Sequence, residues 1–163
     1  MHNRYDDIMD RINFRYVRGS GKLRQGAIEQ LESDIGFVLP SDYREFISKF
    51  GITAGRGDVR YGQFESPEEE EASVEVFYGI KADDTYESYD LQNIREGFED
   101  VLPGHLLAIA SSPGGQILLS LAGNDKAMVY WWAPDCGSPG LDDLIPIARD
   151  FDTFMRSLRV HEE

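Results

Sequence analysis

Helical spacing of apolar residues predicts three helices in the first third of the chain. They cover residues 4–14, 27–35 and 40–50. Their buried faces are expected to consist of Tyr5, Ile8 and Ile12 in the first helix, of Ala27, Ile28, Leu31 and Ile35 in the second, and of Tyr43, Phe46, Ile47 and Phe50 in the third. Gly36 follows the second stripe at once and is a natural helix end, while Pro40 stands near the first turn of the third helix, where a missing N–H costs least.

In the middle of the chain the pattern of apolar residues predicts strands. The predicted strands are residues 74–80, 106–110, 116–121 and 128–132, and Val74, Val76, Tyr78 and Ile80 are expected on one face of the first. Turns at residues 111–115 and 122–125 join the later strands into hairpins. Two further helices are predicted at residues 91–98 and 151–158, the second with Asp150 as its N-cap.

Helices at both ends of a run of hairpin-linked strands predict the α+β class. We expect a single domain with a largely antiparallel, curved sheet, N-terminal helices packed on it and a closing C-terminal helix. The length of 163 residues suits one domain, and no internal repeat or linker divides the chain. A hydrophobic fraction of 41% with 12% aromatic residues is enough for a packed core.

Cysteine usage and the N-terminal residues point to one cellular compartment. Cys136 is the only cysteine, so an intramolecular disulfide and a cysteine-based metal cage are both excluded. The first residues are polar and do not resemble a secretory signal, and no apolar run approaches the ~20 residues that span a bilayer. We therefore expect a soluble, cytoplasmic protein that does not enter a membrane.

The negative charge of the chain is concentrated in one segment. The formal net charge is −14, but residues 65–100 alone hold 13 acidic side chains against two basic ones. Such an acidic chain is a poor partner for nucleic acid or an anionic membrane, because both are polyanions. The acidic segment is either a solvated loop that keeps the protein soluble or a surface that attracts a cationic partner.

Tryptophan residues near acidic ones add a second candidate for partner binding. Trp131 and Trp132 are adjacent on a predicted strand and must point to opposite faces, so one belongs to the core and the other is either covered or available to a partner. The candidate partner-binding residues are Glu68, Glu69, Glu70, Glu71, Asp83, Asp84, Glu87, Trp131 and Asp135.

No residue pattern predicts catalysis, a cofactor or a metal site. The three histidines are His2, His105 and His161, and they lie far apart without ligand spacing. Residues 19–22 match a phosphate loop only in part, because Leu23 stands where Ser or Thr is needed. Cys136 follows Asp135, whose carboxylate opposes thiolate formation. The acids cluster where hydrophobic residues are sparse, which favours a solvated face over a catalytic pocket.

Residues 28–46 resemble the opening signature of the SUKH superfamily, which joins bacterial immunity proteins with fungal cell-wall-assembly regulators. The residues that carry the resemblance are Ile28, Leu31, Glu32, Gly36, Leu39, Pro40, Asp42, Tyr43 and Phe46. Four later blocks look like the family's in the same order. They are Val76 to Ile80; Leu102 and Pro103 with Leu106 to Ala110 and the Gly114–Gly115 pair; Val129, Tyr130 and Trp132; and Ile147 and Ala148 with Phe151, Phe154 and Leu158 as the closing helix.

The resemblance implies a non-enzymatic protein that binds and neutralises a cognate toxin, commonly a nuclease or another toxin domain. Toxins that act on nucleic acid carry basic substrate channels, which an acidic surface can occupy. It also implies a family core over residues 25–160, preceded by a helical extension over residues 1–24. An intracellular regulatory or scaffolding module of the cell-wall-regulator type is the alternative within the family, and an enzyme that uses acidic residues is a third hypothesis. The sequence leaves the oligomeric state and the identity of the toxin open.

Overall fold

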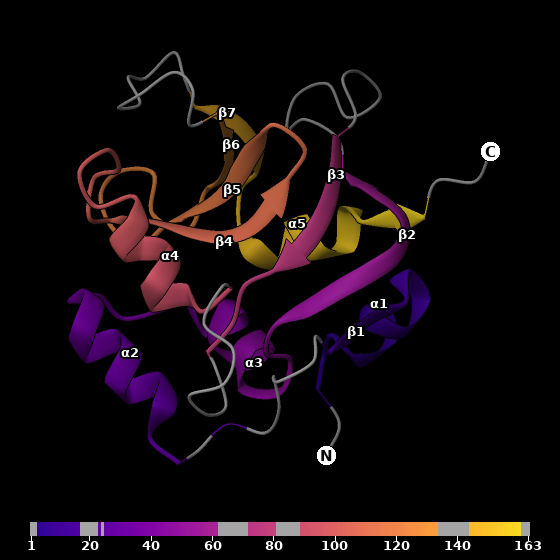
Figure 1. Ribbon diagram of the computed structural model, residues 1–163, viewed down its shortest axis with the longest axis horizontal. Helices are drawn as coiled ribbons and strands as arrows, with labels where there is room; N and C mark the ends of the chain where they lie inside the picture. The colour runs from indigo at the N-terminus through magenta and orange to yellow at the C-terminus, as the bar shows by residue number, and fades with distance from the viewer. Residues whose placement is uncertain are drawn as a thin grey trace.

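The protein is described by a computed structural model, in which helices and strands assemble into one α+β fold (Figure 1). The structure describes residues 3–16, 23, 25–61, 72–80, 89–133 and 144–160. In chain order the elements are α1 (Asp6–Ile12), β1 (Phe14–Tyr16), α2 (Ala27–Ile35), α3 (Ser41–Lys49), β2 (Thr53–Tyr61), β3 (Ala72–Phe77), α4 (Leu91–Gly97), β4 (Leu106–Ser112), β5 (Gly115–Ser120), β6 (Val129–Trp132), β7 (Ile145–Ala148), α5 (Phe151–Ser157) and β8 (Arg159–Val160).

Local signals set the helix ends as the sequence predicts. Gly36 ends α2 in the left-handed conformation, with φ of 82°, and its N–H donates to the Glu32 carbonyl. Pro40 is the N-cap of α3. The Asp150 side chain accepts a hydrogen bond of 2.7 Å from the Thr153 N–H, which confirms it as the N-cap of α5.

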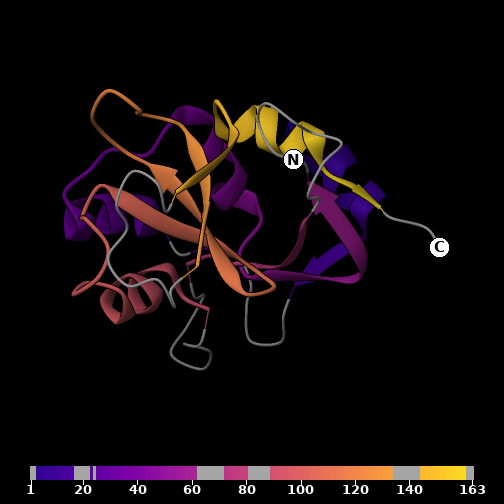
Figure 2. The same ribbon diagram turned by 90° about the horizontal axis from the view of Figure 1, so that it is seen from above.

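The sheet is antiparallel throughout its named strands. Its eight described strands follow the order β1-β2-β3-β4-β5-β6-β7, and β8 pairs with the edge of β2 that β1 leaves uncovered. Register shifts interrupt β2 between Ala54 and Val59 and β4 between Ala108 and Ala110. Such irregularities bend and twist strands, which accounts for the curvature seen from above (Figure 2). The α+β class with a largely antiparallel, curved sheet is confirmed.

Four strands of this sheet were not predicted. They are β1, β2, β7 and β8. β2 contains two glycines and three charged residues, so its sequence lacks a strand pattern, and pairing on both edges holds it extended instead. Assigning Ile147 and Ala148 to the closing helix was wrong. They lie in β7, which pairing with β6 holds extended, with Ala148 opposite Val129.

Helices cover the two faces of the sheet unequally. α1, α3 and α5 pack on one face, here called the helical face, whereas α4 packs on the other, here called the α4 face (Figures 1 and 2). Phe77 of β3 is fully buried on the helical face, against Phe46 of α3. β3 thus carries apolar side chains on both sides, because the predicted row that includes Val76 lies on the side opposite to Phe77.

Aromatic rings fill the core under the helical face. Phe46 lies at their centre, with ring centroids 5.2–6.4 Å from those of Tyr5, Tyr43, Phe50, Phe77 and Phe151. These distances match the tilted and edge-to-face arrangements that aromatic pairs prefer. One residue of α3 thus joins the start of α1, the sheet and α5.

Two buried tyrosines of this core differ in hydrogen bonding, which gives a stability test. The Tyr5 hydroxyl donates to Asp152 at 3.0 Å, whereas the buried Tyr43 hydroxyl has no partner among the described residues. Tyr43→Phe is expected to leave the free energy of unfolding unchanged or to raise it by about 1 kcal/mol, and Tyr5→Phe to lower it by about 1–2 kcal/mol. Urea unfolding measures both. A loss in Tyr43→Phe as large as that in Tyr5→Phe would contradict this account.

Candidate functional site

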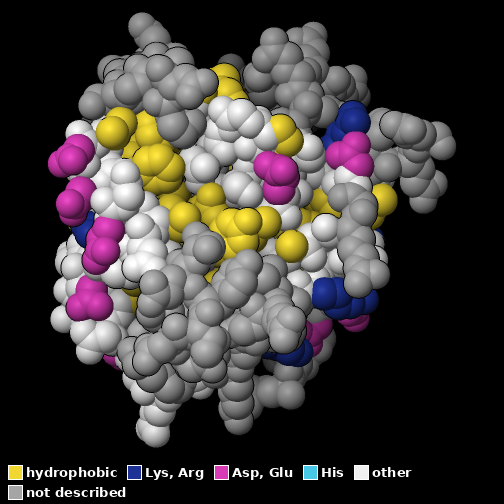
Figure 3. Space-filling view, in the orientation of Figure 1, with side chains coloured by type: hydrophobic (Ala, Val, Ile, Leu, Met, Phe, Trp, Pro, Cys, Tyr) yellow, Lys and Arg dark blue, Asp and Glu magenta, His cyan; other side chains and the backbone are white. Residues whose placement is uncertain are grey.

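The α4 face leaves part of the sheet open. A row of paired residues crosses this face from β2 to β6, formed by Ala54, Val76, Ser111, Gln116 and Trp132. The first four are partly exposed, and only Trp132 is fully buried. Figure 3 views the protein from this side and shows a band of hydrophobic side chains across it. A partly apolar, accessible sheet face of this kind suits protein contact.

Two tyrosines of the acidic segment, Tyr78 and Tyr89, lie together on this face. The Tyr78 hydroxyl donates to the Gln116 side chain at 2.5 Å, and the Tyr89 ring stacks on Tyr78 with centroids 6.1 Å apart. Burial raises the pKa of Tyr78 to about 12, so the hydroxyl stays protonated at neutral pH. A bridge between Gly79 and Asp90 brings the two ends of residues 81–88 together at this point.

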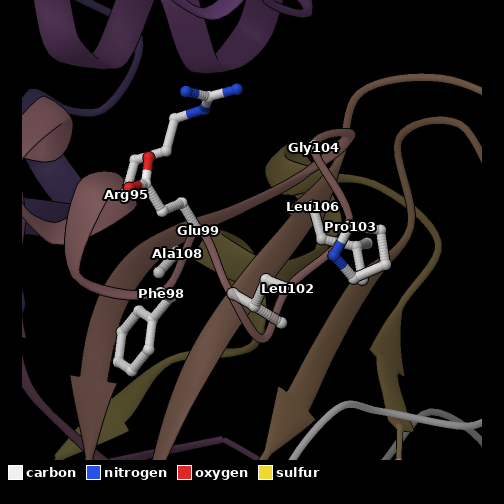
Figure 4. Close-up of a pocket in the computed structure, with 8 residues that line it drawn as sticks. All are labelled: Arg95, Phe98, Glu99, Leu102, Pro103, Gly104, Leu106 and Ala108. Atoms are coloured by element: carbon white, nitrogen blue, oxygen red, sulfur yellow. The ribbon is translucent and has the colours of Figure 1, made fainter.

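A pocket opens beside α4, at the left of the view in Figure 1 (Figure 4). Its volume is about 160 Å³. The lining residues are Arg95, Phe98, Glu99, Leu102, Pro103, Gly104, Leu106 and Ala108. The Phe98 ring packs edge-on against Trp132 at 5.3 Å, which fixes the end of α4 to the sheet. We refer to this site as the α4 pocket.

Acidic side chains gather along the edge of the molecule that carries α4 (Figure 3). Glu96, Glu99 and Asp100 are exposed, and none of them pairs with a Lys or Arg among the described residues. The Arg95 guanidinium instead donates to the Ile35 carbonyl at the end of α2, over 3.5 Å. This edge therefore presents uncompensated negative charge to solvent.

A hydrogen-bonded carboxylate holds the turn between β5 and β6. Asp125 accepts from the Tyr130 hydroxyl at 2.7 Å and from the Ser120 hydroxyl at 3.0 Å. Burial works to raise the pKa of Asp125, but these hydrogen bonds outweigh it and hold that pKa below the ordinary carboxyl value. Ser120 is fully buried, so its hydroxyl is out of reach of a substrate. The cluster stabilises the turn and does not resemble a catalytic site.

The predicted partner-binding residues fall mostly outside the described part of the chain. Those that do so are Glu68, Glu69, Glu70, Glu71, Asp83, Asp84, Glu87 and Asp135. Trp132 is the buried tryptophan, and Trp131 is partly exposed on the helical face, where its ring packs over Gly115. Its role in binding stays a prediction.

The described ends of two of these segments lie close to Trp131. Tyr61, the last described residue before the Glu68–Glu71 run, bonds the Ser112 hydroxyl at 3.0 Å. Ser112 pairs with Gly115, the residue that the Trp131 ring covers. Ala133, the last described residue before Asp135, follows two positions after Trp131. One end of the sheet, here called the Trp131 end, thus holds Tyr61 and Ala133, the last described residues before the two segments.

The α4 pocket was missed by sequence reasoning. Phe98, Leu102 and Leu106 each fit a core pattern, and only the fold shows that they surround an open space. The acidic residue of the lining, Glu99, belongs to the acidic segment of residues 65–100, and this was the signal that the sequence offered for the site. Among the described residues, no group of three His, Cys, Asp or Glu side chains is placed to hold a metal ion, and no helix is long and apolar enough to cross a membrane.

Comparison with known proteins places the chain in a family. Residues 22–157 match the model of the SMI1 / KNR4 family (SUKH-1). The chain is also similar to the SPbeta prophage-derived uncharacterized protein YokK of Bacillus subtilis (strain 168), with 28% identity over 146 residues. That alignment covers 80% of this chain and 72% of the relative. The family match spans α2 to α5 and includes the residues that line the α4 pocket.

The Asp125 cluster predicts a pH-dependent contribution to stability. Because its pKa is lowered on folding, the carboxylate stabilises the fold above the unfolded carboxyl pKa of about 4, and this contribution is lost as pH falls through the lower folded value. Asp125→Asn should therefore lower the melting temperature at pH 6 more than at pH 3. The exposed Asp100→Asn is the control, with little effect at either pH. An equal effect of Asp125→Asn at both pH values would contradict the assignment.

Proposed function

The chain belongs to the SMI1 / KNR4 family (SUKH-1), and from this premise we propose that it is an immunity protein that binds and neutralises a cognate toxin in the cytoplasm. Family membership fits an immunity role in general. The toxin is proposed to be a nuclease or another enzyme that acts on nucleic acid, since such proteins carry basic substrate channels. The protein acts by binding, and its partner is a protein with a basic surface.

The location of the negative charge is the observation that carries this proposal. Residues 65–100 hold a net charge of −11, with two basic side chains against 13 acidic ones. The described acids Glu96, Glu99 and Asp100 in this segment are exposed and have no cationic partner among the described residues. A compact polyanion can occupy a channel built for nucleic acid, and its field speeds encounter with a basic partner.

The proposed interface combines the α4 face and the Trp131 end of the sheet. Gly79 and Asp90, which bridge at the α4 face, flank the acidic residues 81–88 in sequence, and Tyr61, which bonds Ser112 at the Trp131 end, precedes the Glu68–Glu71 run in sequence. Trp131 is a large, partly exposed ring beside acidic residues in sequence, a combination suited to a binding hot spot. A regulatory or scaffolding role has no observation of this structure in its favour.

Co-expression tests the function directly. The C-terminal domain of the protein that the neighbouring gene encodes is induced with and without this protein, and a non-cognate SUKH protein serves as the control. Growth should be rescued only by this protein, and the two proteins should elute together in gel filtration. Failure of rescue together with the absence of a complex would overturn the proposal.

Charge reversal tests the acidic run. Glu69→Lys combined with Glu70→Lys should lower the association rate by about tenfold at low salt and flatten its salt dependence, because the steering field is weakened. Asp7→Lys combined with Asp10→Lys makes the same change of charge at exposed positions of α1 and should have a smaller effect. Stopped-flow association at two salt concentrations measures both. Equal slowing by the two pairs would remove the run from the interface.

Truncation of Trp131 tests the other end of the surface. Trp131→Ala should raise the dissociation rate by about tenfold or more, as expected for a hot-spot aromatic residue, with little change in association. Surface plasmon resonance separates the two rates, and the melting temperature of the variant controls for folding. An unchanged dissociation rate would exclude Trp131 from the contact.

A further inference from the structure

The α4 pocket is built from three short pieces of chain. The end of α4 supplies one wall, the turn that follows supplies the second, and the start of β4 forms the floor (Figure 4). Backbone hydrogen bonds from the N–H groups of Val101 and Leu102 to the Phe98 carbonyl, at 2.9 and 2.8 Å, close this turn. Because Phe98 itself packs on the buried Trp132, the pocket is preformed.

The size of the α4 pocket suits one side chain. Its volume of about 160 Å³ is close to that of an engineered cavity of ~150 Å³ that holds a single benzene molecule. Small-molecule sites are commonly larger, at roughly 300–1,000 Å³. A residue from a partner protein therefore fits the space better than a free metabolite does.

The lining of the pocket favours a long cationic side chain. Leu102, Leu106 and Ala108 give it an apolar interior, while Arg95 and Glu99 add charged groups to the lining. A leucine or phenylalanine side chain would leave the Glu99 carboxylate unpaired. Lysine and arginine instead bury an aliphatic stem and keep a charged head at a polar surface.

The charged residues at the pocket also favour a lysine or arginine side chain. Glu99 lines the pocket and has no cationic partner among the described residues, and Glu96 and Asp100 lie near it in sequence. The one cation of the lining, Arg95, is engaged with the Ile35 carbonyl, and its guanidinium points away from the apolar floor (Figure 4). Glu99 is thus the charged group of the lining that has no partner among the described residues.

We propose that the α4 pocket receives one lysine or arginine side chain of the toxin, whose stem lies against Leu102 and Leu106 and whose charged head pairs with Glu99. This inference rests on the proposed function and specifies where the basic surface of the toxin is anchored. The pocket adds a fixed contact to an attraction that is otherwise spread over many acidic residues.

A pair of glycines allows the pocket to be filled with a matched control. Gly104 lines the pocket. Apart from its chain neighbours, the nearest atom to a Cβ added there would be Nη2 of Arg95, at 3.8 Å. Gly97 ends α4 outside the pocket, and a Cβ there would meet nothing within 4 Å. Both are exposed. Gly104→Leu should raise the dissociation rate about tenfold or more, whereas Gly97→Leu should leave it near the wild-type value.

Two exposed glutamates give a second matched pair that does not depend on filling the pocket. Glu99 lines the pocket and Glu96 does not. Glu99→Lys and Glu96→Lys change the net charge equally, so both should slow association to a similar extent. Only Glu99→Lys should also raise the dissociation rate about tenfold or more, because it places a cation where the partner's cation is held.

The four variants and the wild type are compared by surface plasmon resonance with the neighbouring gene's toxin domain as the probe, after their melting temperatures are shown to agree. Faster dissociation confined to Gly104→Leu and Glu99→Lys is the expected result. If the wild type binds and these two variants dissociate no faster than their controls, the pocket is overturned and the immunity function stands. If the wild type does not bind, both proposals are overturned.

Discussion

The packing of Phe46 against five other aromatic rings is the constraint on which the rest of this structure depends. Its ring lies within 6.4 Å of Tyr5, Tyr43, Phe50, Phe77 and Phe151, which come from the start of the chain, α3, the sheet and α5. A cluster of this kind has one low-energy arrangement, because rings at such distances must interlock. The cluster holds α1, α3 and α5 on one side of the sheet, so that α4 alone packs on the other side.

The unequal covering of the two faces connects the fold with the proposed function. On the helical face the aromatic rings around Phe46 serve the core, whereas the α4 face carries a row of partly exposed residues, a side-chain-sized pocket and acids without a cationic partner among the described residues. Most of the described ion pairs, such as Arg4 with Glu45 and Arg44 with Glu32, lie among the N-terminal helices and α5, and a further pair joins Arg60 to Asp58 within β2. Negative charge is thus balanced where the helices dock and left free where a basic partner is expected.

Elements whose signals are local in the sequence were predicted correctly, whereas strands that are held by pairing with distant segments were missed. The stripe that ends at Gly36 and the N-cap at Asp150 gave α2 and α5 correctly, because period, cap and stop are all local. β2 was missed because its glycines and charges carry no strand pattern, and β1, β3 and β8 hold it in place. The α4 pocket could not be predicted, since Phe98 and Leu106 belong to different elements and either one alone indicates a core position.

Hydrogen–deuterium exchange of the protein with and without its toxin tests most directly whether the α4 face is the binding face. We expect slower exchange in the complex for the amides of α4 and of residues 98–105, with no change in α1, which packs on the opposite side of the sheet. Protection confined to α1 and α5, with unchanged exchange in α4, would contradict it.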